Sequence, residues 1–214
     1  FQRTSQITDR IGRKPLIVCG RNSMRKHRFL EIIEKDFKKS KKKFEVYENI
    51  STDAKSNEVN KAISIVKKKK IDFIIGLGGG SAIDAAKAIA VGTNLNRIEK
   101  IIGKTIKPSK KHLPIVAIPT TSGTGSEVSK GSIIKDIKKN FKSGIRGESL
   151  FPKIAIVDPI FSLTLPIEVL AETGFDAFTH LFESYLAKKS NPITEKLSET
   201  GIKILLKYLP ESLK

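Results

Sequence analysis

The sequence predicts an α/β fold, in which a parallel β-sheet covered by helices is followed by a helical segment. Short apolar runs that read as strands alternate with stretches whose apolar residues recur at helical spacing. This alternation is typical of a parallel sheet with helices on both faces. After Pro166 the alternation stops, and residues 167–187 and 192–208 both read as helices with no strand between them.

The expected strands are short, and all but the second, which rests on Phe44, Val46 and Ile50, are nearly continuous in apolar side chains, as strands buried on both faces are. They lie at residues 15–19, 44–50, 71–75, 115–118 and 154–157. The expected helices between them run from Ser23 through Phe37 and over residues 57–70 and 81–91. We place the domain boundary near residues 161–165, which gives an α/β domain of residues 1–162 and a helical segment of residues 163–214.

The chain is strongly basic, with 40 Lys and Arg against 22 Asp and Glu and a formal net charge of +18. The densest lysine clusters, at residues 38–43 and 67–70, fall where predicted helices end, and helix C-termini favour cations. No aromatic residues interleave with them to stack on bases. We therefore expect a solvated lysine-rich surface and no nucleic-acid partner, with a nucleic-acid-binding module as the alternative.

Cys19 is the only cysteine, so no disulfide forms within the chain, and an intracellular protein is expected. Cys19 lies in an apolar run, which favours a buried strand thiol over a nucleophile. No apolar run is long enough to span a membrane, and the N-terminus lacks a signal pattern. These features predict a cytoplasmic protein with no membrane partner.

A glycine-rich loop, Gly78-Gly79-Gly80-Ser81, joins a predicted strand to a predicted helix. Glycines let the backbone approach a phosphate closely, and the free N–H groups of a helix N-terminus attract it. The loop is neither the Gly-x-Gly-x-x-Gly pattern nor a Walker loop, and a bare glycine triplet is more often a tight turn. Its place between strand and helix favours a phosphate site, because doubly wound sheets bind ligands at strand C-termini.

A second polar loop, at residues 119–127, follows the strand at 115–118 and is dense in hydroxyls and glycines. Such a loop is able to surround a phosphate, ribose or carboxamide, or to bond only its own backbone. Two glycine-bearing loops at one edge of a sheet favour a shared dinucleotide cleft.

Asp176 and His180 are four residues apart in a predicted helix, which places them on one face. A carboxylate and an imidazole at this spacing suit a divalent metal, although such a pair is more often a surface interaction. Two ligands do not complete a catalytic site. The other histidines, His27 and His112, lie in polar, basic stretches and are interpreted as surface residues.

Together, three motifs resemble those of the iron-containing (group III) alcohol dehydrogenase family, in the family's order and along nearly the whole chain. They are residues 78–87, the loop at 119–129 and the segment at 174–180, with Lys142 and residues 152–159 in addition. The resemblance implies an N-terminal fragment: an α/β domain that binds NAD or NADP, followed by the start of an all-helical metal-binding domain.

Several residues match positions that bind the cofactor or the metal in the resembled family. The match assigns the pyrophosphate to Gly79, Gly80 and Ser81, and the phosphate and nicotinamide end to Thr120, Thr121 and Thr124. Further cofactor-contacting positions are Gly20, Asp84, Ser129, Lys142 and Leu163. Asp176 and His180 match the first two ligands of Fe²⁺, with Zn²⁺ possible, and the family's other two histidines would lie beyond Lys214.

Two departures from the family pattern bear on the cofactor. Many NAD-using members carry an Asp after the first strand, where this chain has Gly20 followed by Arg21. A lost carboxylate and a gained cation suit a 2′-phosphate, which favours NADP slightly over NAD. The family's usual Asn-Pro segment is replaced by Asp53-Ala54, which leaves the contacts to the adenine side open.

The resemblance implies a metal-dependent, NAD(P)-linked alcohol dehydrogenase or aldehyde reductase that works by hydride transfer on a small alcohol or aldehyde, as a homo-oligomer in one interpretation. A polyol or hydroxy-acid dehydrogenase on the same fold is one alternative. A non-catalytic nucleotide- or nucleic-acid-binding module is another. With half the metal ligands absent, we also expect the fragment to bind cofactor without turnover.

Overall fold

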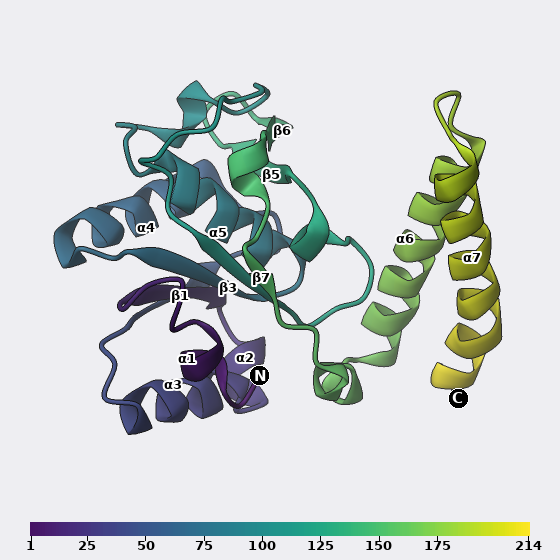
Figure 1. Cartoon of the computed structure of the whole chain (residues 1–214), viewed down its shortest axis with the longest axis horizontal. Coiled ribbons are helices and arrows are strands. Elements are labelled where there is room, and N and C mark those ends of the chain that lie inside the picture. Colours follow the sequence, from purple (N-terminus) through teal and green to yellow (C-terminus); the bar gives the residue numbers. More distant parts are fainter. The chain divides into compact units, whose positions relative to one another are not determined.

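The computed structural model describes all of residues 1–214, which form two compact units (Figure 1). The first comprises Phe1–Thr120 and Ser126–Asp158, and the second comprises Thr121–Gly125 and Pro159–Lys214. The main division therefore falls between Asp158 and Pro159. No local sequence pattern indicated that Thr121–Gly125 would belong with the helical unit.

The first unit is built on a five-stranded sheet in the order β2-β1-β3-β4-β7, in which every neighbouring pair is parallel. The strands are β1 (Pro15–Gly20), β2 (Glu45–Ile50), β3 (Phe73–Gly78), β4 (Ile115–Pro119) and β7 (Ile154–Ala155). β3 and β4 are buried along their whole length, as their continuous apolar sequences predict. The predicted α/β fold with a parallel sheet is confirmed.

Helices cover both faces of this sheet (Figure 1). The shorter helices α1 (Thr4–Ile7) and α2 (Ser23–Lys26) lie with α3 (Phe29–Lys39) on one face, and α4 (Ser56–Lys69) and α5 (Gly80–Gly92) lie on the other. The lysine clusters do occupy the last turns of α3 and α4, where cations are favoured. Short 3-10 turns lie at Ile98–Lys100, Ser126–Val128, Glu148–Leu150 and Pro159–Thr164.

The single helix predicted from Ser23 through Phe37 is wrong, because the chain breaks between α2 and α3. Arg28 is in the left-handed region at φ 61° and ends the regular hydrogen bonding of α2. The break places Phe29 edge-on to Phe1, with ring centroids 5.8 Å apart. The spacing of apolar residues on which the prediction rested does not register a left-handed residue such as Arg28.

An antiparallel hairpin, β5 (Gly131–Asp136) and β6 (Phe141–Arg146), was not predicted from the sequence. Its turn carries Asn140 at φ 47°, and the Asp136 carboxylate accepts hydrogen bonds from the N–H groups of Lys138 and Lys139 at 2.9 and 3.3 Å. Asp and Asn are typical turn residues, because Asp accepts hydrogen bonds from backbone N–H groups two or three residues later and Asn tolerates the left-handed region. Asp136 and Asn140 are therefore the local signals that could have revealed the hairpin.

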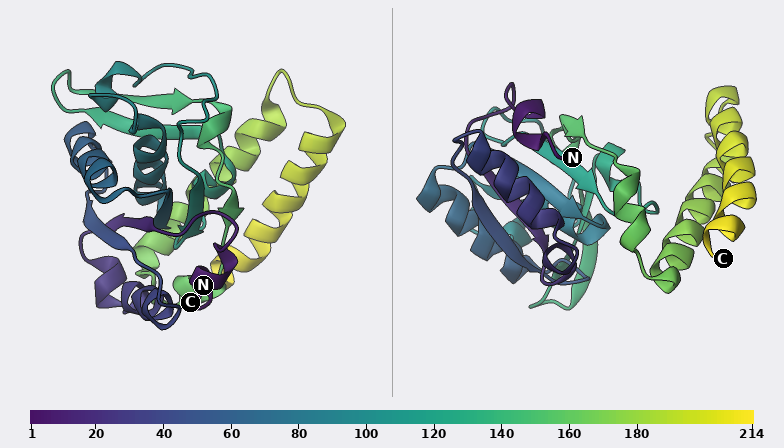
Figure 2. Two further views of the ribbon diagram at one scale, coloured as in Figure 1. Left: turned by 60° about the vertical axis from the view of Figure 1, so that its left-hand side comes forward. Right: turned by 90° about the horizontal axis from the view of Figure 1, so that it is seen from below.

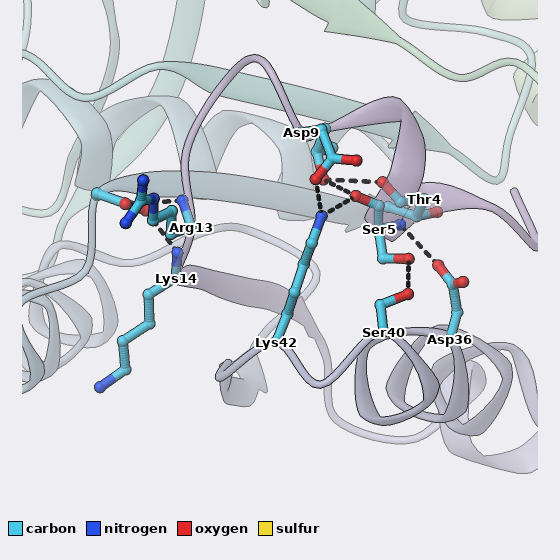
Figure 3. A network of polar contacts seen from close by, with 10 residues as sticks. Thr4, Ser5, Asp9, Arg13, Lys14, Asp36, Ser40 and Lys42 are labelled. Atoms are coloured by element: carbon cyan, nitrogen blue, oxygen red, sulfur yellow. Dashed lines mark hydrogen bonds and ion pairs between the residues drawn. The ribbon is translucent and has the colours of Figure 1, made fainter.

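Polar contacts hold the N-terminal segment on the first unit (Figure 3). The Ser5 N–H donates to the Asp36 carboxylate at 2.6 Å, and the hydroxyls of Ser5 and Ser40 lie 2.7 Å apart. Cys19, on the adjacent strand β1, is fully buried as predicted, and burial raises the pKa of its thiol to about 12. The Cys19 thiol therefore stays protonated, and hence unreactive, in the folded protein.

The second unit contains two long helices, α6 (Ile167–Leu186) and α7 (Pro192–Ser212), which form an antiparallel hairpin (Figure 2). Asn191 caps α7 by accepting hydrogen bonds from the N–H groups of Ile193 and Thr194. Both predicted helices are confirmed.

Glycines let α6 and α7 approach each other closely. A Cβ at Gly174 would lie 2.5 Å from the Leu209 side chain, and one at Gly201 would lie 2.8 Å from that of Leu181. Several large apolar side chains of this unit remain exposed, among them Leu206 at 64%. No helix of the chain combines the length and the apolar character that crossing a bilayer requires.

Candidate cofactor and metal sites

The strand order of the first unit fixes where a ligand site is expected. The chain leaves β1 toward β2 on one side and returns to β3 on the other, so the connections reverse direction between β1 and β3. Open parallel sheets bind ligands outside the carboxyl ends of the strands at such a switch point. β1 ends at Gly20 and β3 at Gly78, and Gly78 is paired with Pro119 of β4. The structure thus brings Gly20, the glycine-rich loop and the start of the polar loop to one edge of the sheet.

The glycine-rich loop leads directly into the N-terminus of α5. Gly78 has φ +143°, which L side chains rarely adopt, and Gly79 takes the N-cap position with no side chain capping the helix. The N–H groups of Gly80 and Ser81 make no hydrogen bond within the chain. The Ser81 hydroxyl donates to the Thr52 carbonyl at 3.1 Å. Free N–H groups and the positive end of the helix dipole make this a site for an anionic group such as a phosphate.

The polar loop starts in the first unit and continues in the second. Thr120 is buried, and its N–H donates to the Gly78 carbonyl at 3.0 Å. Thr121 and Thr124 lie in the segment that belongs to the second unit. There Gly123 packs on α6 so closely that a Cβ would lie 2.7 Å from the Thr173 carbonyl oxygen.

The polar atoms of Asp84 and Ser129 form hydrogen bonds with other residues of the first unit. The Asp84 carboxylate accepts from the Ser126 hydroxyl at 2.5 Å and from the Ile133 N–H at 2.8 Å, and burial raises its pKa. The carbonyl and hydroxyl oxygens of Ser129 accept from the buried Lys87 ammonium at 2.8 and 3.1 Å. The role of Lys87 was missed in the sequence, because its partners follow more than forty residues later in the chain.

Lys142 and Leu163 lie on elements whose positions the sequence did not reveal. Lys142 is on β6, and its ammonium donates to the Asp53 carboxylate at 2.7 Å, which lowers the pKa of that carboxyl. Lys142 thus contacts the loop after β2, in which the Thr52 carbonyl accepts the hydrogen bond from the Ser81 hydroxyl. Leu163 lies in the 3-10 turn of the second unit and is 84% exposed.

At the end of β1, the position of Gly20 has room for a side chain, and the cationic Arg21 follows it in the chain. A Cβ on Gly20 would meet only the Ile50 carbonyl oxygen, at an ordinary contact distance of 3.7 Å. The Arg21 guanidinium is 60% exposed and lies 3.3 Å from a carboxylate oxygen of buried Glu58. Glu58 also accepts from the N–H and hydroxyl of Ser51, so its charge is shared among several donors.

Asp176 and His180 form the candidate metal-ligand pair on α6. Asp176 Oδ1 and His180 Nε2 lie 3.7 Å apart, and both side chains reach solvent. This separation is within the sum of two metal–ligand bonds of about 2 Å each, and the donor types suit Fe²⁺ or Zn²⁺. No group of three or more acidic, His or Cys side chains is close enough elsewhere in the chain to hold a metal ion. The pair therefore fits as part of a ligand set.

The other two histidines, His27 and His112, were predicted to be surface residues and are only partly exposed. Both His27 and His112 are half-buried, and the His27 ring lies 6.1 Å from that of Phe29. His112 Nδ1 is buried without a hydrogen-bond partner, and burial lowers the pKa of the imidazole.

A parallel sheet with an uncapped, glycine-rich helix N-terminus at its switch point is the architecture of a dinucleotide-binding domain. Comparison with known protein families gives the class more closely. Residues 1–159 match the family model described as iron-containing alcohol dehydrogenase, and residues 170–214 match that of the C-terminal part of the Fe-containing alcohol dehydrogenase family. The chain belongs to the iron-containing alcohol dehydrogenase family.

Individual relatives agree with this assignment. The chain is 37% identical over 165 residues to a 1-propanol dehydrogenase of Citrobacter freundii, covering 77% of this chain and 41% of that protein. It is 31% identical over 212 residues to an NADPH-dependent butanol dehydrogenase of Clostridium saccharobutylicum, covering 97% and 54%. The crystal structure of NADH-dependent butanol dehydrogenase A from Thermotoga maritima matches with a TM-score of 0.90 at 29% identity, covering 98% and 53%. The chain thus spans about half the length of these relatives.

The backbone at Gly78 gives a prediction about stability. Gly78→Ala should lower the free energy of unfolding by about 1–3 kcal/mol, because its φ of +143° is strained for any L side chain. Gly131→Ala is the matched control, since a Cβ there meets no atom within 4 Å. Urea denaturation of the three proteins measures the difference. Equal stability of the two variants would contradict the strained geometry of the loop.

Proposed function

We propose that this chain supplies the nicotinamide-cofactor site and part of the metal site of an NAD(P)-dependent alcohol dehydrogenase. The observation that carries the proposal is the uncapped N-terminus of α5 at the switch point of the sheet. Family membership supports it, as do relatives named for 1-propanol and butanol. The proposed reaction is the reversible oxidation of a small alcohol to an aldehyde or ketone.

In this proposal the chain's residues bind and orient the cofactor. The N–H groups of Gly79, Gly80 and Ser81 hold the pyrophosphate at the positive end of α5. Within the first unit, Thr120, Ser129 and Lys142 line the remainder of the proposed cofactor site. Thr121, Thr124 and Leu163 are further proposed cofactor contacts, which rest on the match of their motifs to the family alone. A bound nicotinamide would supply the hydride acceptor, and the protein's part is to hold it in place and exclude water.

Asp176 and His180 are the proposed metal ligands on α6. Their carboxylate and imidazole are the donor types of Fe²⁺ and Zn²⁺ sites, and Fe²⁺ is proposed as the natural metal from the family. The metal would supply Lewis-acid polarisation of the substrate oxygen. The contribution of the chain is to keep both donors on one helix face and open to solvent.

The end of β1 favours NADPH over NADH in our proposal. Gly20 offers no carboxylate to the ribose hydroxyls, and the exposed Arg21 guanidinium is a partner for a 2′-phosphate. The relatives include one named for NADPH and one named for NADH, so the family alone does not select the cofactor. We further propose a cytoplasmic enzyme that assembles as a homo-oligomer, with no nucleic-acid or membrane partner.

The cofactor site is tested by binding. Gly80→Asp should weaken NADPH and NADH binding by about tenfold or more, because a carboxylate at the helix N-terminus repels the pyrophosphate. The measurement is the change in nicotinamide fluorescence on titration with protein. Ser64→Asp, which adds the same charge on the exposed face of α4, is the control and should bind as the parent does. A Gly80→Asp protein of unchanged affinity would remove the phosphate site from the proposal.

The choice of cofactor is tested at Gly20. Gly20→Asp should shift the ratio of dissociation constants toward NADH by about tenfold, because a carboxylate accepts from ribose hydroxyls and repels a 2′-phosphate. The open space around the Gly20 Cβ position lets the side chain fit. Gly20→Asn controls for size without charge. If the parent chain already prefers NADH, or if Asp and Asn act alike, the assignment of this position is wrong.

The metal pair is tested by titration with Co²⁺, whose visible absorption reports nitrogen and oxygen ligands. We expect weak binding by the parent chain and about tenfold or greater loss in His180→Ala, because only two protein ligands are within reach. His27→Ala serves as the control, since His27 lies in the other unit. Equal loss in both variants would indicate nonspecific histidine binding and overturn the assignment.

A further inference from the structure

Lys87 of α5 is a fully buried cation within the first unit. Its ammonium donates to the Ser129 carbonyl at 2.8 Å, the Ser129 hydroxyl at 3.1 Å and the Gly131 carbonyl at 2.9 Å. These three acceptors account for all three N–H donors of an ammonium group. The side chain therefore joins α5 to the segment that leads into β5.

Asp84, one turn earlier on the same helix, holds the same segment at both of its ends. One carboxylate oxygen accepts from the Ser126 hydroxyl and the other from the Ile133 N–H, and the Asp84 carbonyl accepts from the Ser132 hydroxyl at 2.7 Å. The turn Ser126–Val128 is thus fixed by Asp84 at its first residue and by Lys87 at Ser129, directly after its last residue. Residues 126–133 are anchored to α5 by side chains of opposite charge.

Burying an ammonium group in a helix–sheet interface costs desolvation free energy that an apolar side chain would not. Burial lowers the pKa of Lys87 to about 8, while the charges of Asp84 on α5 and Glu127 in the turn act in the opposite direction. An apolar side chain would fill the volume but would leave the two carbonyl groups without a donor. The position of Lys87 is therefore best explained by the geometry it imposes on Ser129 and Gly131.

The anchored segment leads into the hairpin that carries Lys142. In this hairpin Lys142 is paired with Lys135, whose N–H donates to the Ala54 carbonyl at 2.9 Å. The Lys142 ammonium then reaches Asp53, beside the loop that Ser81 contacts. A single helix, α5, thus presents the candidate phosphate site at its N-terminus and sets the position of Ser129 and of the hairpin one to two turns later.

We propose that Asp84 and Lys87 are positioning residues of the cofactor site, which hold Ser129 and Lys142 in register with the glycine-rich loop. Asp84 then acts through the hairpin and does not touch the cofactor itself. This inference rests on the proposed function, because Ser129 and Lys142 matter only if they line a cofactor site.

The test removes the ammonium and then returns it. Lys87→Ala deletes the side chain beyond Cβ, and n-propylamine added at pH 7 supplies the missing three carbons and the amino group. Hydrogen–deuterium exchange over residues 126–136 reports the order of the anchored segment, and nicotinamide fluorescence reports NADPH and NADH affinity. Lys61→Ala, an exposed lysine on α4, is the matched control. Lys87→Met retains the apolar volume and takes the place of the alanine variant if that variant does not fold, in exchange and affinity measurements without amine.

We expect Lys87→Ala to exchange faster over residues 126–136, to bind cofactor about tenfold more weakly and to regain both properties with propylamine, while Lys61→Ala matches the parent. Faster exchange with unchanged affinity would overturn the positioning role, as would unchanged exchange. Failure of the amine to restore either property would overturn the role of the ammonium. A parent chain that binds no cofactor would overturn the proposed function, and the exchange measurement would still decide whether Lys87 orders the segment.

Discussion

The close packing of α5 against β3 is the constraint on which the first unit depends. A Cβ on Gly76 would lie 2.9 Å from the Ala86 Cβ and 3.1 Å from the Ile83 Cα, so only glycine allows the helix to lie this close to the strand. The short turn through Gly78 and Gly79 then delivers the helix N-terminus to the edge of the sheet. This packing places the candidate phosphate site, because the first N–H groups of α5 have no side-chain cap and lie at this edge.

The same helix carries both the apolar and the polar parts of the architecture. Its alanines and isoleucines are buried against the strands and α4, and the hydrophobic effect supplies the stabilising free energy. Asp84 and Lys87 fix the orientation of the residues that they contact. Hydrogen bonds to a charged group are directional, whereas apolar contacts are not. Most of the chain's positive charge lies elsewhere, and part of it is at the ends of α3 and α4, where solvent and helix dipoles stabilise it.

Local patterns predicted most of the fold. Apolar runs predicted four strands of the parallel sheet, and the spaced apolar residues Phe44, Val46 and Ile50 predicted β2. The change after Pro166 predicted α6 and α7, because buried strands and one-faced helices leave direct traces in hydrophobic spacing. The hairpin β5–β6 was missed because its strands are short, partly exposed and marked mainly by the turn residues Asp136 and Asn140. The break at Arg28 was missed because the left-handed backbone of this residue leaves no trace in the spacing of apolar residues.

The sequence by itself determined the α/β class, the two glycine-bearing loops and the spacing of Asp176 and His180, since each depends on residues that are neighbours in the chain. Tertiary structure alone decided which loops meet at one sheet edge, since this depends on strand order. It also decided the partners of buried and exposed charges. Lys142 finds Asp53 across 89 residues, and Lys87 finds Ser129 across 42, and contacts at such separations are fixed by the folded backbone and not by any local pattern.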